Sequence, residues 1–198
     1  MTVHLRRWLF LLWIAAVCLL SACKGGAPVA FTVDGVPVEK AELIYYMRDN
    51  ASAVAAEIER RFAADSAAEG FWDRSCGEVV PLEYLKAYTA EQIARTKVEQ
   101  LIAREQGIET AMTWTQQHNE LEEQSRRRRE AYEAGEVVYG SIERDFFAYS
   151  ADMLYTMRAA VQEKLGLTAA DYAALVDERL KTAKIRYEDM SISSDDIA

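Results

Sequence analysis

The sequence predicts a mainly α-helical protein with a short β segment near each end. Through most of the chain, apolar residues recur every three or four positions, which is the period of an amphipathic helix. Two sequences that begin at Thr113 and Thr168 have the spacing of capping boxes, which open helices. Apolar residues alternate, as in strands, around residues 29–38 and 184–190.

Residues 1–22 have the organisation of a secretory signal peptide. Arg6 and Arg7 form its basic start, and residues 8–20 form an uncharged apolar run. This run is shorter than the roughly 20 residues that a membrane-spanning helix needs. The segment is therefore expected to direct export and to be removed.

The sequence Leu20-Ser21-Ala22-Cys23 resembles the lipobox of lipoprotein precursors. The resemblance implies that the chain is cut before Cys23 and that this thiol carries a diacylglycerol, with residues 23–28 as a lipidated spacer. The protein would then be exported and anchored on the extracytoplasmic side of a bacterial membrane. The alternative is an ordinary signal peptide with a cysteine at this point. Loss of Cys18 and lipidation of Cys23 leave Cys76 as the only free thiol, so no disulfide within the chain is expected.

A hairpin and five helices are expected to form one domain over residues 29–190. Asp34-Gly35 suits the tight turn of the hairpin, and Pro37 makes the second arm an edge strand or a very short strand, because it has no N–H to donate. Proline at a first helical turn, glycine past a last turn and hydroxyl caps set the helix limits. We expect helices over about 40–64, from Pro81 to Gly107, from Thr113 to Ala134, from Ser141 through Leu165 and from Thr168 through Leu180.

The remaining segments lack a helical period. Residues 65–80 form a connection pinned by aromatic residues, in which Cys76 is expected to occupy a turn that needs only a small apolar residue. Residues 184–190, "KIRYEDM", alternate like a short strand. Residues 191–198 are expected to be a disordered tail.

The charge balance disfavours two classes of partner. Without Arg6 and Arg7 the chain has 21 basic and 32 acidic residues, a net charge of −11. Such a chain is a poor partner for nucleic acid or for bare anionic lipid. The basic run Arg126–Arg129 has glutamates four residues away on both sides, which predicts a solvated face of internal ion pairs. Contact of this run with anionic headgroups or an acidic partner is the alternative.

The residue inventory favours binding over catalysis. His118 is the only histidine after the signal peptide, and its stripe with Trp114 and Leu121 favours a packed or half-exposed side chain. The sequence has no CxxC or HExxH motif and no glycine loop for phosphates, so no metal, cofactor or catalytic residue is expected. Tyrosines and methionines are abundant, and both suit surfaces that accept varied apolar peptides. Tyr45, Met153 and Met157 are the candidate peptide-binding residues; packing in the core is the alternative for each.

Four segments follow one another in a familiar order: "FTVDGVPVEKAEL", the helix that ends "LIAREQGI", "AGEVVYGSIERDFFAY" and "LVDERLKTAKIRYE". Their order resembles that of the SurA and PrsA family of extracytoplasmic chaperones. The resemblance implies a SurA-like helical chaperone domain in which the last helix and strand return to the first hairpin. Relatives with isomerase activity insert a parvulin domain before the closing helix, and no insert is present near Gly166-Leu167-Thr168.

Together these features predict a membrane-tethered chaperone that binds unfolded or exported polypeptides without catalysis. An adaptor lipoprotein with one dedicated partner is one alternative. A peptidyl-prolyl isomerase homologue with residual activity is the other.

The lipobox generates a direct test. Cys23→Ala removes the thiol that would carry the lipid, so the variant is expected to take up no labelled fatty acid. It should either leave the membrane fraction or accumulate as an uncut precursor. Labelling of the variant at the level of the unchanged chain would contradict the lipobox assignment.

Overall fold

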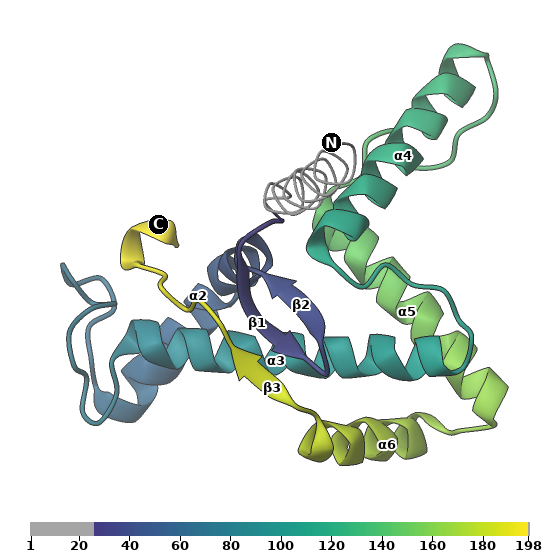
Figure 1. Cartoon of the computed structure of the whole chain (residues 1–198). Helices are drawn as coiled ribbons and strands as arrows, with labels where there is room; N and C mark the ends of the chain where they lie inside the picture. Colours follow the sequence, from purple (N-terminus) through teal and green to yellow (C-terminus); the bar gives the residue numbers. More distant parts are fainter. Residues whose placement is uncertain (1–25, 198) are drawn as a thin grey trace, which may run out of the picture.

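The computed structural model describes residues 26–197. The predicted signal peptide and the lipidation site Cys23 lie outside these residues. Within them, the chain forms five α-helices and a three-stranded antiparallel sheet (Figure 1). The elements are β1 (Val29–Val33), β2 (Val36–Glu39), α2 (Lys40–Phe62), α3 (Pro81–Glu105), α4 (Trp114–Glu133), α5 (Phe146–Leu165), α6 (Ala169–Thr182), β3 (Ile185–Tyr187) and the 3₁₀ helix η1 (Ser194–Asp196). The predicted fold class is confirmed.

The first hairpin has the expected turn. Asp34 and Gly35 both have positive φ angles, 48° and 83°. Such angles match the turn to the twist of its strands, and aspartate and glycine adopt them at low cost. β2, which contains Pro37, lies at one edge of the sheet, as expected from its missing N–H.

The end of the chain returns to this hairpin. β3 pairs antiparallel with β1, so the strand order is β2-β1-β3. The turn residue Asp34 joins the two ends directly, because its N–H donates to the Lys184 carbonyl and its carboxylate accepts from the Lys184 N–H. The sheet is thus closed by a contact between residues 150 positions apart.

α3 is the central element of the core. It runs behind the sheet in the view of Figure 1, and α2, α5 and α6 pack against it. Leu85, Ala94 and Val98 on α3 are fully buried, as are Leu43 and Met47 on α2. Tertiary packing of this kind, between helices of one chain, supplies most of the stability of amphipathic helices.

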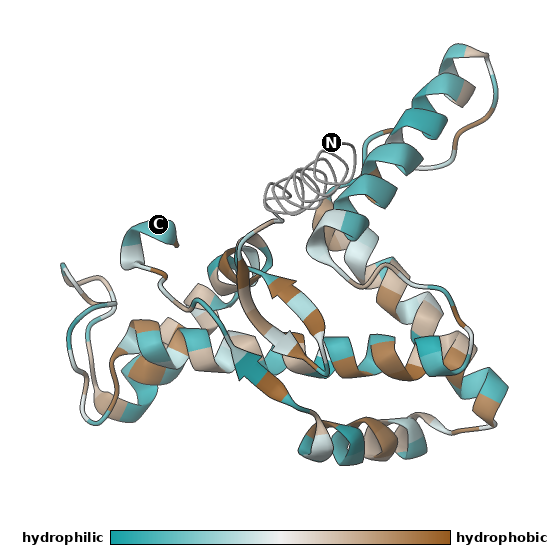
Figure 2. Cartoon of the chain, viewed as in Figure 1, coloured by the Kyte–Doolittle hydropathy of each residue, from teal (hydrophilic) through white to brown (hydrophobic). Residues whose placement is uncertain are grey.

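α4 lies largely outside this core. Gln117 is its only buried residue, and the helix is predominantly hydrophilic in Figure 2, in contrast to β1 and β2. α4 projects from the body, and the chain returns through residues 134–145 to α5 (Figure 1). We call α4, this return segment and the first three turns of α5 the arm.

The start of α5 differs from the expectation. Asp145, not Ser141, is the N-cap residue, and its carboxylate accepts a hydrogen bond of 2.8 Å from the Ala148 N–H. Arg128 on α4 donates to the carbonyls of Ser141 and Tyr139, which holds the return segment in an irregular conformation against α4. The helix therefore begins later, where this contact ends.

The prediction of a disordered tail is wrong for residues 191–197. Ile192 and Ile197 are buried in the main core, and Ser193 and Asp196 form a capping box around η1. Arg48 on α2 donates to the Asp196 carbonyl. The sequence predicts a disordered tail because most of its residues are polar. Its two isoleucines fill the core only because the end of this segment lies against α2 in the folded chain.

Ile192→Ala is expected to lower the free energy of unfolding by about 2–4 kcal/mol, because it leaves a cavity beside the core. Asp195→Ala, an exposed change in the same segment, should alter stability by less than about 0.5 kcal/mol. Urea unfolding of both variants makes the comparison. Equal stability of the two variants would show that the tail contributes nothing to the core.

Candidate functional site

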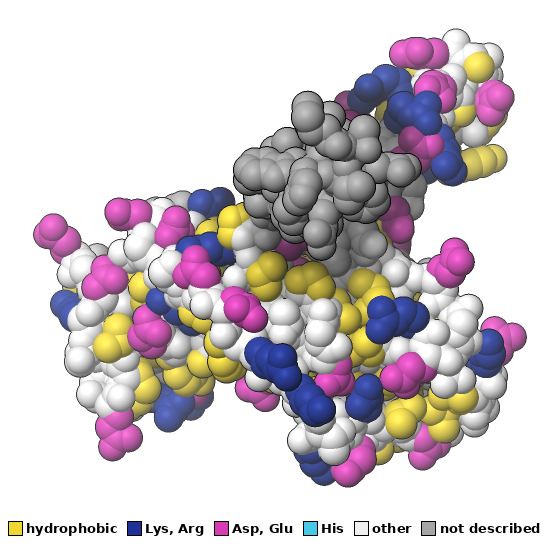
Figure 3. Space-filling view, viewed as in Figure 1, with side chains coloured by type: hydrophobic (Ala, Val, Ile, Leu, Met, Phe, Trp, Pro, Cys, Tyr) yellow, Lys and Arg dark blue, Asp and Glu magenta, His cyan; other side chains and the backbone are white. Residues whose placement is uncertain are grey.

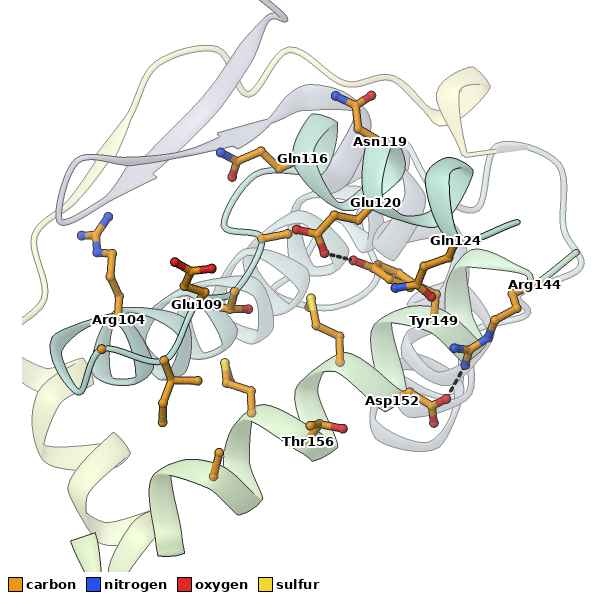
Figure 4. A pocket seen from close by; sticks show the side chains of 17 residues that line it. Arg104, Glu109, Gln116, Asn119, Glu120, Gln124, Arg144, Tyr149, Asp152 and Thr156 are labelled. Carbon is orange, nitrogen blue, oxygen red and sulfur yellow. Dashed lines mark hydrogen bonds and ion pairs between the residues drawn. The ribbon is translucent and has the colours of Figure 1, made fainter. Parts of the chain in front are cut away.

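A large cleft lies at the base of the arm, between α4, α5 and the segment that joins α3 to α4 (Figure 4). Its volume is about 1080 Å³. Because the cleft is open to solvent, it can admit part of an extended chain. Its lining comprises Arg104, Gly107, Ile108, Glu109, Thr110, Ala111, Gln116, Asn119, Glu120, Gln124, Arg144, Tyr149, Asp152, Met153, Thr156, Met157 and Ala160.

The α5 wall of the cleft supplies apolar and sulfur-containing surface. Tyr149, Met153 and Met157 follow one another at four-residue intervals, which places them on one side of the helix. Met153 is half-buried, whereas Met157 is only 3% exposed and belongs to the core. Methionine adapts its shape to different neighbours because it is unbranched and flexible.

The α4 wall is polar. Gln116, Glu120 and Gln124 lie one turn apart, with Asn119 beside them (Figure 4). The Tyr149 hydroxyl crosses the cleft and donates to the Glu120 carboxylate at 2.7 Å. Burial and the neighbouring Glu120 carboxylate raise the pKa of Tyr149, so it stays a neutral donor at physiological pH.

A buried polar network forms the floor behind the cleft. Lys97 on α3 forms an ion pair of 2.8 Å with Glu42 on α2, and the two side chains are 0% and 3% exposed. Lys97 also donates to the Met112 carbonyl at 2.7 Å, and Gln100 donates to the Ala111 carbonyl at 2.9 Å. Burial raises the pKa of Glu42, against the opposing effect of Lys97. The network holds the α3–α4 connection against the core.

The base of α4 is anchored to the hairpin as well. The capping box predicted from Thr113 and Gln116 is present. In addition, Glu39 at the end of β2 accepts hydrogen bonds from the N–H and the hydroxyl of Thr115, at 3.1 and 2.7 Å. The α4 wall of the cleft therefore starts from a fixed position.

The three predicted peptide-binding residues do not lie on one surface. Met153 and Met157 line the cleft, but Tyr45 lies in an aromatic cluster, 5.1 Å from Trp114 and 5.3 Å from Phe146 between ring centroids. The single groove expected from the sequence is therefore not formed by all three. A role of each in peptide binding stays a prediction.

His118 is packed, as expected from its stripe. Its ring stacks on Phe146 with centroids 4.3 Å apart and lies 4.0 Å from the Trp114 ring. Its Nδ1 is 3.1 Å from the Trp114 carbonyl oxygen. These contacts hold the imidazole inside the aromatic cluster that joins α2, α4 and α5.

Cys76 occupies the turn that the sequence predicts. It is buried, and its N–H donates to the Val79 carbonyl at 2.8 Å in an isolated β-bridge just before α3. The thiol fills space beneath this turn, which a small apolar side chain can do equally well.

The arginine run is paired on the arm. Arg127 contacts Glu123 and Arg126 contacts Glu130 at the predicted four-residue spacing. Arg126 also contacts Glu123, three residues away. Arg129 instead pairs with Glu143 of the return segment. That second kind of contact needs the chain to fold back, so the spacing along one helix could not reveal it.

The arm exposes large apolar side chains that were not singled out from the sequence. Tyr139 is 85% exposed and Val137 is 78% exposed in the return segment. The others are Tyr132, Phe147 and Tyr155. The pair Phe146-Phe147 could have predicted one of these exposed side chains, because a helix with one buried face cannot bury two consecutive residues equally.

The chain shows no match to a family model, to a curated protein or to a solved structure. Within residues 26–197, no group of three or more His, Cys, Asp or Glu side chains is arranged to hold a metal ion. No helix in that range is long and apolar enough to cross a bilayer.

Lys97→Met is expected to lower the free energy of unfolding by about 3–5 kcal/mol at neutral pH, because Glu42 loses its buried cation. When folding raises the pKa of a carboxyl, that group lowers the free energy of unfolding as the pH rises above the pKa that it has in the unfolded chain. The loss should therefore be larger at pH 8 than at pH 5 in urea unfolding.

Lys86→Met is the matched control, because its partner Glu83 is exposed. This pair should contribute less than about 1 kcal/mol. Equal losses in the two variants, or a loss in Lys97→Met that grows toward acid pH, would contradict the role given to the buried pair.

Proposed function

We propose that this protein is an exported lipoprotein that holds unfolded or partly folded polypeptides near the membrane, by binding alone. The observation that carries the proposal is the pairing of an open cleft with an arm that exposes large apolar side chains. A group of such side chains on a protein surface typically marks a site of interaction.

The chemistry of the cleft suits varied polypeptides. Met153 and Tyr149 on the α5 wall offer apolar contact without a fixed shape. Asn119 and Gln124 on the α4 wall carry amides that both donate and accept hydrogen bonds, as a peptide main chain does. Such a site recognises the common features of an extended chain more than any one sequence.

The surface of the arm suits the same role. Phe147 and Tyr155 lie on a different side of α5 from the cleft residues, so apolar segments can be contacted on both sides of the helix. The chain as a whole is acidic, and the net charge of −11 expected after signal removal keeps complexes apart by repulsion. Weak contacts of many kinds suit transient holding.

The proposal includes the tether and the resemblance. Lipidation at Cys23 would place the domain on the extracytoplasmic side of the membrane, where exported polypeptides emerge unfolded. The return of β3 to the first hairpin is the arrangement that the likeness to SurA and PrsA chaperones implies. The absence of a domain-sized insert between α5 and α6 supports a role without isomerase chemistry.

The methionines allow holding to be separated from stability. Met153→Ser and Tyr155→Ser are expected to weaken suppression of client aggregation about fivefold each, from a loss of about 1 kcal/mol of apolar contact. Both should leave the melting temperature nearly unchanged. Met157→Ser should instead cost about 2–5 kcal/mol of stability, because that side chain is in the core.

Light scattering of a denatured client and thermal melting are measured on the same samples. Ala159→Ser, an exposed change on α5 outside the cleft, is the matched control and should alter neither quantity. Unchanged suppression in both Met153→Ser and Tyr155→Ser would contradict the proposed role of the arm and cleft.

A further inference from the structure

The free edge of β3 presents main-chain groups that the sheet does not use. Asp34 N–H donates to the Lys184 carbonyl, and Glu188 N–H donates to the Ala30 carbonyl. In an antiparallel ladder, alternate residues bond to the same neighbour. Lys184, Arg186 and Glu188 therefore direct their main chain toward β1, and Ile185 and Tyr187 direct theirs outward.

The opposite edge of the sheet, formed by β2, is less able to hydrogen-bond to an added strand. By the same alternation, Val36 and Val38 of β2 bond to Val33 and Phe31, so the residue between them points its main chain outward. That residue is Pro37, which has no N–H to donate. The sheet thus has one edge that can extend, and all three residues of β3 are exposed.

A basic hollow lies beside this open edge. Its volume is about 440 Å³, and it is lined by Thr32, Asp34, Gly35, Arg179, Thr182, Lys184 and Arg186. Basic side chains gather over β3 and α6 on the face shown in Figure 3. Arg179 is engaged with Asp34 and Glu105, but Lys184 and Arg186 form no ion pair with any residue in 26–197.

The hollow and the edge belong to one site. Thr32 and Arg186 are direct partners in the ladder, so their side chains lie on the same face of the sheet. A residue opposite Arg186 in an added strand would lie on that face too, beside the hollow. Its neighbours would lie next to Ile185 and Tyr187 on the other face, where Tyr187 already contacts Phe31 at 5.9 Å between ring centroids.

We propose that the β3 edge binds an extended client segment as a fourth strand, with an acidic residue opposite Arg186 and an apolar residue on each side of it. This deepens the proposed function, on which it rests, by naming a class of client sequence. Main-chain bonds to Ile185 and Tyr187 supply the binding, and the unpaired cations supply the preference for a carboxylate.

A second copy of the chain fits this edge poorly. Antiparallel pairing of β3 with itself in the register that joins Ile185 to Tyr187 sets Arg186 directly opposite Arg186. That pair is of the closely spaced type, in which like charges repel. The cations thus discourage self-association at an edge that stays open to acidic segments.

The test uses the full chain and two five-residue peptides, acetyl-Thr-Val-Glu-Val-Thr-amide and the same peptide with Lys in place of Glu. We expect the Glu peptide to protect the Ile185 and Tyr187 amides from hydrogen exchange and to bind about tenfold more tightly than the Lys peptide. Arg186→Glu should reverse this order. N-methylation of the two valines should abolish binding, because it removes donors without altering the protein.

Each of the following outcomes would overturn the proposal. Equal binding of both peptides would remove the charge preference. Binding of inorganic phosphate without amide protection would make the hollow a simple anion site, and protection that rises with protein concentration alone would identify a second copy as the occupant. Because Met153→Ser tests holding at the cleft, failure at the β3 edge with holding intact would reject this inference and leave the proposed function standing.

Discussion

The arrangement of the arm depends on the buried ion pair between Glu42 and Lys97. Two charges removed from water repay their desolvation only when they are close and well bonded. Lys97 meets this condition by contacting both Glu42 and the Met112 carbonyl. One oxygen of Glu42 has no hydrogen-bond partner, so the carboxylate relies on the lysine. The pair therefore ties α2, α3 and the start of the arm into one unit.

This constraint explains how an exposed helix can form a defined site. α4 buries little of its own surface, so its position comes from its ends. At its start, Glu39, Gln100 and Lys97 hold the preceding segment and Thr115. Farther along, Arg128 and Arg129 hold the return segment. A polar helix positioned in this way leaves the apolar wall of α5 open along the cleft.

The division between core and surface also separates two kinds of apolar residue. Met153 and Met157 are one helical turn apart and both line the cleft, yet Met153 is half-buried and Met157 packs into the core. Sequence spacing places both on the same side of α5 but cannot say how deep the neighbouring helices reach. The same limit applies to Tyr45, whose neighbours Trp114 and Phe146 come from two other helices.

The sequence by itself determined the local structure: the hairpin turn at Asp34-Gly35, the capping boxes at Thr113 and Thr168, and the strand near residue 185. These depend on contacts between residues close in the chain, so composition and period suffice to predict them. The tertiary structure decided the rest, including the burial of the tail isoleucines, the late start of α5 and the open edge beside a basic hollow in an acidic protein. Each arises from contacts between groups that are more than a hundred residues apart or that lie on either side of a loop. A local sequence pattern cannot predict such tertiary contacts.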